Sequence, residues 1–369
     1  MKKIITTLVL LLLISACSSN NVKKEDDKIE PVKTQKEIRV NEILDKMTLK
    51  EKIGQLFIVR MPVENAIEDA KKYHLGGMVI FSDNLENKTL DSLTKSNKAL
   101  QKELDIPMLI GIDEEGGTVS RLSYSKLVEK AFKSPQTLYK ENGMKAIKED
   151  TIAKSQLLKS VGINLNLAPV VDVATDSDAF IYDRTIGLNA KKTSEYAKVV
   201  VETMKENQMG STLKHFPGYG NNKDSHVEIV TDSKKLKTFR KSDFLPFIAG
   251  INAQADSILV SHNIVNAIDS TQPASISSKV HDILRNELNF DKVIMTDDLD
   301  MAGIAEFVSQ EKAALKAIQA GNDMVMTSHY KQQIPYIIKA IEKEEISIDQ
   351  IDQSVTRVLN MKYDLNLIK

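Results

Sequence analysis

Residues 211–220 read Ser-Thr-Leu-Lys-His-Phe-Pro-Gly-Tyr-Gly, and here an apolar run changes abruptly into a loop. The first six residues are typical of a β-strand, whereas the proline and the two glycines stop any regular element. The polar loop that follows contains Asp224 and His226. Lys214 and His215 therefore stand at the end of a predicted strand, where a rigid scaffold commonly presents functional side chains.

The same pattern, a short apolar run that ends in polar residues, occurs eight times along the chain. The runs are rich in Val, Ile, Leu and Met and lie at 54–59, 76–82, 107–113, 164–172, 211–216, 256–262, 292–298 and 322–328. Stretches with helical spacing lie at 38–52, 63–73, 88–104, 146–161, 193–207, 244–253, 280–288, 310–320, 332–342 and 348–362.

Strands that are apolar on both faces and alternate with helices are typical of a covered parallel sheet. Eight such units in about 320 residues predict an α/β fold, a (β/α)8 TIM-type barrel with one catalytic domain at 38–369. A doubly wound open sheet is the alternative. No strand end reads G-x-G-x-x-G, so the alternative lacks a dinucleotide-binding fingerprint.

In such a barrel the active site lies at the C-terminal ends of the strands. Polar residues gather at those ends: Asp113, Glu114, Glu115 and Arg121; Asp172 and Arg184; Lys214 and His215; Ser261, His262 and Asn263; Asp297 and Asp298; Thr327, Ser328 and His329. A barrel core alone would exclude these charges, because burying an unpaired charge is costly. The strand ends are therefore predicted to form a functional site.

The composition limits the classes of partner. The 369 residues are 42% hydrophobic and 27% charged, enough for a large core. There are 50 basic and 51 acidic residues, so no basic field exists to attract nucleic acid, and we predict no nucleic-acid partner. Tryptophan is absent, so stacking on a sugar would need Tyr, Phe or His.

The N-terminus is predicted to be a targeting segment. Two lysines precede a mostly apolar run at 4–14 that is too short to span a bilayer comfortably, which indicates a signal peptide at 1–16. Small residues before Cys17, the chain's single cysteine, resemble a bacterial lipoprotein processing site. That resemblance implies a diacylglyceryl thioether on Cys17, with acyl chains such as palmitate, and a cell-membrane anchor facing the extracytoplasmic side. Residues 17–37 are predicted to be a flexible tether. The alternative is an ordinary secretory signal with an incidental cysteine.

Glycoside hydrolysis by displacement is the first chemical interpretation. It needs an ionised carboxylate below the sugar and a proton donor beside the leaving oxygen. Asp297 directly follows an apolar strand and is the best carboxylate, while Asp298 is expected to point the other way. His226 would be the donor, because Asp224 can accept its Nδ1 proton and so set its tautomer.

Two other interpretations are open at this stage. One is a metal site built from His215, His226, His262 and nearby aspartates, but their spacings match no compact ligand signature. We therefore predict no metal and no cofactor. The other is a non-catalytic lipoprotein that binds cell-wall sugars, which would keep the pocket without needing a carboxylate opposite a proton donor.

Several motifs in order resemble those of one family, the bacterial β-N-acetylglucosaminidases of glycoside hydrolase family 3, in their single-domain lipoprotein form. The matching stretches are 46–57 (KMTLKEKIGQLF), 112–121 (IDEEGGTVSR), 166–172 (NLAPVVD), 214–218 (KHFPG), 224–226 (DSH) and 296–297 (TD). The resemblance covers about residues 38 to 369, the whole predicted domain.

The resemblance implies a retaining exo-β-N-acetylglucosaminidase that removes terminal β-linked N-acetylglucosamine from peptidoglycan-derived glycans. Asp297 would be the nucleophile and His226 with Asp224 the acid/base dyad. Asp113, Arg184, Lys214 and His215 would hold the sugar hydroxyls, with Arg121 and His262 shaping the pocket. Many relatives take the acid from a second domain; here we expect it from the loop after the fifth strand. Phosphorolysis, with phosphate as acceptor, is also open.

Two positions depart from the family pattern. Tyr219 stands where the family usually has a histidine, which we expect to change contacts within the loop. Glu114 stands where the family usually has a glutamine, and we expect the additional carboxylate to make that corner of the site more acidic.

Overall fold

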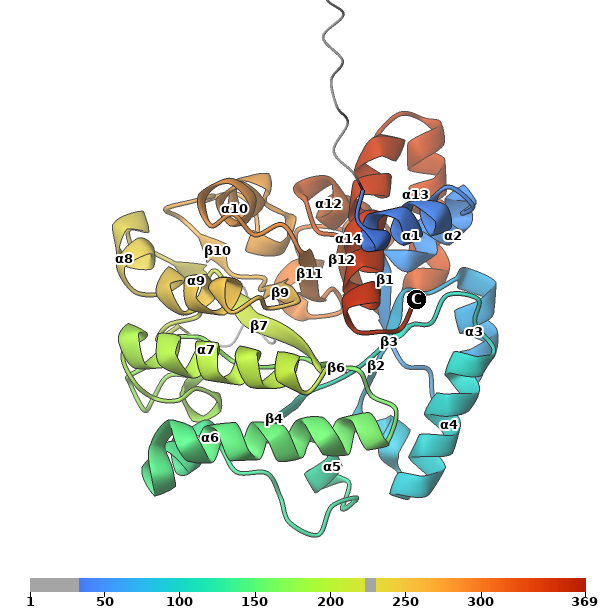
Figure 1. The fold of residues 1–369 in the computed structure, drawn as a ribbon. Coiled ribbons are helices and arrows are strands. Elements are labelled where there is room, and N and C mark those ends of the chain that lie inside the picture. Colours follow the sequence, from blue (N-terminus) through green and yellow to red (C-terminus); the bar gives the residue numbers. More distant parts are fainter. Residues whose placement is uncertain (1–32, 223–229) are drawn as a thin grey trace, which may run out of the picture.

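The computed structural model describes residues 33–222 and 230–369, and its centre is a closed barrel of eight parallel strands (Figure 1). Strand β12 pairs with β1 to close the ring. Around the barrel the strands are β1 (Phe57–Arg60), β2 (Gly77–Ile80), β3 (Leu109–Ile112), β6 (Leu165–Asn166), β7 (Gly210–Phe216), β9 (Ser257–Val260), β11 (Val293–Asp298) and β12 (Met324–Thr327). The predicted (β/α)8 barrel is confirmed, and the open-sheet alternative is excluded.

Helices surround the barrel, and α1 packs against α14, so the first and last described helices lie side by side (Figure 1). The longer helices are α1 (Gln35–Leu44), α2 (Leu49–Gln55), α3 (Ala66–Tyr73), α4 (Leu90–Lys102), α6 (Pro135–Ser160), α7 (Ala190–Glu206), α9 (Phe244–Asn252), α12 (Gln310–Ala320), α13 (Tyr330–Glu342) and α14 (Ile348–Asp364). Shorter ones are α5 (Arg121–Tyr124), α8 (Leu236–Lys241), α10 (Ser278–Asp282) and α11 (Ala302–Ala305). Two small sheets, β4 (Glu114–Gly116) with β5 (Val119–Ser120) and β8 (Thr231–Asp232) with β10 (Ile264–Val265), lie outside the barrel.

The N-terminal helical stretch differs from its prediction. Helix α1 begins at Gln35, inside the predicted tether of 17–37, because Thr34 caps it and Glu37 completes a capping box. The single helix expected at 38–52 is two helices, since Thr48 and Glu51 form a second capping box that starts α2. The start of the apolar run at 54–59 belongs to α2, and β1 begins at Phe57.

The fourth predicted strand is much shorter than its apolar run. Only Leu165–Asn166 pair as β6, although the run extends to Asp172. Pro169 has no backbone N–H to donate and therefore interrupts the ladder. Val170 then forms an isolated bridge with Lys214, which keeps the end of the run beside β7.

Alternate residues of each strand pack into two different apolar clusters, which explains why the strands are apolar on both faces. Ile58, Val79 and Leu109 belong to the cluster of barrel-interior side chains, together with Leu259, Met295 and Met326. Phe57, Val59, Met78 and Ile80 belong to the layer between the strands and the helices. Each fully buried side chain of this kind contributes roughly 1.5–3 kcal/mol of hydrophobic free energy.

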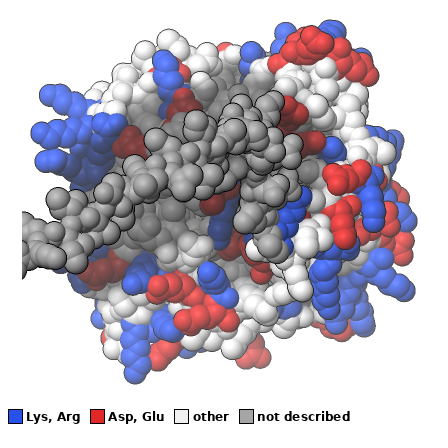
Figure 2. Space-filling view, turned by 45° about the horizontal axis from the view of Figure 1, so that its top comes forward, with Lys and Arg blue, Asp and Glu red and all other residues white. Residues whose placement is uncertain are grey.

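On the face shown in Figure 2, acidic and basic side chains are interspersed, apart from one basic group at the upper left. No helix within residues 33–222 and 230–369 is both long and apolar enough to cross a membrane.

Candidate active site

A cavity of 260 Å³ lies where the strands end at their C-terminal side. It is lined by Arg60, Phe81, Asp113, Val119, Arg121, Leu167, Arg184, Lys214, His215, Leu259, Asp297, Asp298, Met301 and Met326. Six predicted site residues meet here: Asp113, Arg121, Arg184, Lys214, His215 and Asp297. The fold brings together residues that lie up to 184 positions apart in the sequence, from Asp113 to Asp297. Their position at predicted strand ends had indicated this.

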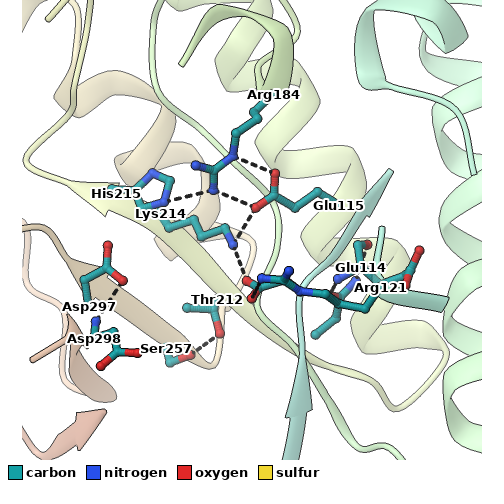
Figure 3. A network of polar contacts seen from close by, with 12 residues as sticks. Glu114, Glu115, Arg121, Arg184, Thr212, Lys214, His215, Ser257, Asp297 and Asp298 are labelled. Atoms are coloured by element: carbon teal, nitrogen blue, oxygen red, sulfur yellow. Dashed lines mark hydrogen bonds and ion pairs between the residues drawn. The ribbon is translucent and has the colours of Figure 1, made fainter. Parts of the chain in front are cut away.

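Lys214 is the centre of the polar network on one side of the cavity (Figure 3). Its Nζ lies 2.8 Å from Oδ1 of Asp113 and 2.6 Å from Oε1 of Glu115. Arg184 binds Glu115 with a two-pronged contact, Nε to Oε2 at 3.0 Å and Nη2 to Oε1 at 2.8 Å. Arg121 reaches the other oxygen of Asp113 at 3.3 Å. Three cations thus hold two carboxylates, and each carboxylate is fixed by two of the cations.

These partners keep the cluster ionised at neutral pH. Burial opposes the charge of Asp113, but Lys214 and Arg121 outweigh it and bring its pKa well below its usual value. Burial likewise opposes the charge of Glu115, but Arg184 and Lys214 lower its pKa to about 2. Burial disfavours the charged form of Lys214, yet Asp113 and Glu115 raise its pKa. The cavity therefore presents fixed donors and acceptors, which suit a ligand with several hydroxyl groups.

His215 is held as a neutral ring. Burial, followed by the nearby charge of Arg184, brings its pKa well below 6.5. Nη2 of Arg184 lies 3.2 Å from its Nε2, and Oδ2 of Asp172 lies 2.8 Å from its Nδ1. Burial raises the pKa of Asp172 to about 6. The contacts with Arg184 and Asp172 hold the ring of His215 in place. At neutral pH, His215 is therefore a positioned hydrogen-bonding group and not a proton shuttle.

The loop after β7 packs tightly beneath this histidine. The peptide bonds Lys214–His215 and Phe216–Pro217 are both cis. Tyr219 is fully buried, its ring lies edge-on to His215 with the centroids 5.2 Å apart, and its backbone N–H donates to Asp172 at 2.7 Å. Tyr219 therefore packs behind His215, on the side of Asp172.

Asp297 and Asp298 both line the cavity, although Asp298 was predicted to point the other way. Their carboxylates do point in different directions, as Figure 3 shows. Strand β11 also contains a bulge, because Met295 is opposite Met324 and Asp298 is opposite Met326, so three steps on β11 match two on β12.

His262 is not among the residues that line the cavity. It is fully buried, with Nδ1 2.7 Å from Oγ of Ser275 and Nε2 2.9 Å from the carbonyl oxygen of Asp298. Because a carbonyl oxygen can only accept, Nε2 carries a proton. His262 thus contacts the site through the backbone of Asp298. Asp224, His226 and the lipidation residue Cys17 lie outside the described residues.

Glu114 does not make the cavity more acidic, contrary to our expectation. Its carboxylate is fully buried away from the cavity, where it contacts Oγ of Ser120 and accepts from the backbone N–H of Leu122 at 2.9 Å. Burial raises the pKa of Glu114.

Sequence reasoning gave no role to four polar residues of the site: Arg60, Glu115, Asp172 and Asp298. Glu115, Asp172 and Asp298 were among the polar residues found at strand ends, but no individual role was assigned to them. Arg60 is the last residue of β1, and its guanidinium lies 4.4 Å from the ring centroid of Phe81. Within residues 33–222 and 230–369, no group of three or more His, Cys, Asp or Glu is arranged to hold a metal ion.

The family follows from a match over residues 48–361 to the model described as glycosyl hydrolase family 3 N terminal domain. The chain belongs to glycosyl hydrolase family 3. The resemblance drawn from the motifs is confirmed, as is the prediction of a glycoside hydrolase.

Relatives in this family carry the name β-hexosaminidase. One from Idiomarina loihiensis is 33% identical over 280 residues, which cover 74% of this chain and 83% of the relative. β-Hexosaminidase LpqI of Mycobacterium tuberculosis is 29% identical over 331 residues, 85% of this chain and 82% of the relative. The structure of a family 3 β-N-acetylglucosaminidase from Paenibacillus sp. superimposes with a TM-score of 0.81 at 28% identity. It matches 87% of this chain, which spans 63% of the Paenibacillus chain, less than two thirds.

Proposed function

We propose that this chain is a retaining exo-β-N-acetylglucosaminidase, with Asp297 as the nucleophile and His226 with Asp224 as the acid/base dyad. The observation that carries the proposal is that Asp297 shares one cavity with the charged cluster around Lys214 and Arg184. Displacement with retention needs such a carboxylate at the anomeric carbon, and the cluster supplies the hydroxyl contacts that hold the sugar there.

The proposed reaction has two displacement steps at the anomeric carbon. The carboxylate of Asp297 forms a bond to the anomeric carbon while the bond to the leaving oxygen breaks and that oxygen takes the proton of His226. Water then attacks the same carbon from the vacated face, gives its proton to His226, and releases the ester oxygen of Asp297. Two inversions give retention. Asp224 would stabilise the imidazolium of His226 between turnovers.

The shape of the cavity supports removal of one terminal sugar at a time. The lining residues Leu167, Leu259 and Met326 also belong to the barrel-interior cluster, so the cavity ends on an apolar floor. Charged donors and acceptors lie above that floor, for example the donor Lys214 and the acceptor Asp113. A terminal sugar would place its ring on the floor and its hydroxyls against the cluster. The relatives named β-hexosaminidase support N-acetylglucosamine as the sugar.

Release of a chromogenic group from a β-N-acetylglucosaminide tests the activity directly. Asp297→Ala should abolish turnover. Asp291→Asn is a matched control, because Asp291 is exposed and lies just before the same strand at its opposite end, and should keep full activity. No release at any pH by the unaltered chain would favour the sugar-binding alternative. A release rate that depends on added phosphate would favour phosphorolysis.

The two proposed roles separate in further experiments. His226→Ala should spare substrates whose leaving group needs no protonation, so an equal loss on all substrates would contradict the acid assignment. A slow fluorosugar should form a covalent adduct, and tandem mass spectrometry should place it on Asp297 and not on the adjacent Asp298.

A lipid anchor at Cys17, on the outer side of the cell membrane, is the second part of the proposal, and it supports peptidoglycan-derived glycans as the natural substrates. The proposal of a lipid anchor is based on the small residues that precede Cys17. Cells fed an alkyne fatty acid should label the unaltered chain, while Cys17→Ser should lose both the label and the membrane fraction. An unlabelled wild-type chain in the medium would overturn the anchor.

A further inference from the structure

Two adjacent residues with carboxylate side chains, Asp297 and Asp298, line one small cavity next to the bulge in β11. Like charges this close disfavour each other's ionised form. A nucleophilic carboxylate must be ionised to attack, so the neighbour presents an electrostatic problem that the site has to solve.

Four contacts fix the position of Asp298. Its side-chain Oδ2 lies 2.5 Å from Nε of Arg60 and its Oδ1 accepts from the backbone N–H of Asp300 at 3.0 Å. Its carbonyl oxygen accepts from His262 at 2.9 Å. Its backbone N–H donates to Oδ1 of Asp297 at 2.8 Å. The position of Asp298 therefore determines where one oxygen of Asp297 lies.

Arg60 is well placed to compensate the charge of Asp298. It ends β1, and the guanidinium packs on the ring of Phe81. The other cations that line the cavity have acidic partners of their own: Lys214 and Arg121 contact Asp113, and Arg184 contacts Glu115. In the described part of the chain, Arg60 is the basic side chain that forms an ion pair with Asp298.

We propose that Arg60 and Asp298 form a charge-balancing pair that positions Asp297. Arg60 cancels the negative charge of Asp298, and the backbone N–H of Asp298 orients the carboxylate of Asp297. The inference rests on the proposed function, since it takes Asp297 as the nucleophile. Arg60 and Asp298 are positioning residues, because neither needs to contact the reacting atoms. Burial, together with the nearby carboxylate of Asp300, raises the pKa of Asp298 to about 6 although Arg60 lowers it, so the ionisation of Asp298 is sensitive to Arg60.

The two partners should shift the pH dependence in opposite directions. Arg60→Gln removes the cation that favours the ionised forms of the two adjacent carboxylates, so the acid limb of kcat/KM should move to higher pH. Asp298→Asn leaves the charge of Arg60 uncompensated, so the acid limb should move to lower pH. Each shift should be roughly 0.5–1.5 pH units. The double variant Arg60→Gln/Asp298→Asn should return toward the unaltered profile.

The test is the pH profile of kcat and KM for the three variants and for Arg60→Lys, which keeps the positive charge and should stay near the unaltered profile. A purely structural role would lower kcat or the folded fraction without moving the limbs in opposite directions. Shifts of the same sign, no shift, or a double variant that retains one partner's shift would overturn the pair. If Arg60→Gln fails to fold, the nearly isosteric Asp298→Asn still decides, because an unchanged or raised acid limb contradicts the proposal.

Failure of the proposed function has a different signature. If Asp297→Ala retains turnover, or if the fluorosugar adduct maps to Asp298, then the nucleophile assignment itself is wrong. If the adduct maps to Asp297 and the two acid limbs do not diverge, only the charge-balancing pair is wrong.

Discussion

Oδ2 of Asp172 lies 2.8 Å from Nδ1 of His215, and this contact determines which ring nitrogen carries the proton. An ionised carboxylate can only accept, so Nδ1 donates and Nε2 is left to accept from Arg184. The other oxygen of Asp172 accepts from the backbone N–H of Tyr219. One buried carboxylate thus orients both the ring that faces the cavity and the first residues of the loop behind it.

Asp172→Asn should lower kcat/KM by roughly 10- to 100-fold, the size expected when a buried charge-assisted hydrogen bond is lost. The amide can donate to Nδ1 and so favour the wrong tautomer of His215, which would then present a proton toward Arg184. Kinetics on the chromogenic substrate measure the loss. The matched control is Asp178→Asn, an exposed carboxylate of the same loop, which should keep the unaltered value. An unchanged kcat/KM in Asp172→Asn would contradict this role.

The barrel could be predicted because its signal repeats. Eight apolar runs alternate with helices, and the helix predicted at 310–320 coincides with α12. Local chemistry explains the errors: Pro169 shortens β6, Thr34 starts α1 earlier than hydrophobic spacing indicated, and Thr48 starts a second helix inside the single predicted one. Hydrophobic periodicity detects the packed face of an element but not the polar residues that end it.

The site was predictable only as far as strand ends determine it. Asp113 directly follows β3, and Lys214 and His215 are among the last residues of β7, so the barrel rule places them in the cavity. The direction of a side chain also depends on register. The bulge in β11 next to Asp298 has no sequence signal of its own, and His262, at a strand end as well, faces Ser275 and does not line the cavity.

Lys214→Met should destabilise the fold by about 3–5 kcal/mol, because Asp113 and Glu115 would remain buried without their shared cation. Urea unfolding near neutral pH measures the change in the free energy of unfolding. Lys198→Met is the matched control, since its pair with Glu202 is largely exposed and spaced by four residues on α7. That control should change stability by less than about 0.5 kcal/mol. A small loss in Lys214→Met would show that the two acids find other partners.

Glu115 should make the fold sensitive to acid. Burial opposes its ionisation, but Arg184 and Lys214 lower its pKa from 4.5 to about 2 in the folded state. Its contribution is therefore fully present above the unfolded pKa and is lost as pH falls from there toward 2. Glu115→Gln should remove this part of the pH dependence, which amounts to roughly 3 kcal/mol for a shift of that size. Unfolding curves of both proteins across this range check the slope, and parallel curves would contradict the prediction.

Lys362 should have the opposite pH signature, at the other end of the molecule. It lies fully buried on α14, in the same face as Val358, and its Nζ donates to Oε1 of Gln55 at 2.6 Å. Burial lowers its pKa from 10.5 to about 7. Between these values the unfolded chain holds a proton that the folded chain has released, so stability rises with pH across the window. Below the folded pKa the destabilising effect is complete.

Lys362→Met removes that titration, while the loss of the bond to Gln55 is the same at every pH. The free energy of unfolding of the wild type, minus that of Lys362→Met, should therefore increase by up to about 1.4 kcal/mol per pH unit above neutrality. Urea unfolding at neutral and mildly alkaline pH measures this difference. Lys343→Met, an exposed lysine just after α13, should give a difference that stays flat. If the Lys362 difference is also flat, the ammonium group is hydrated or paired in solution, and burial does not determine its charge.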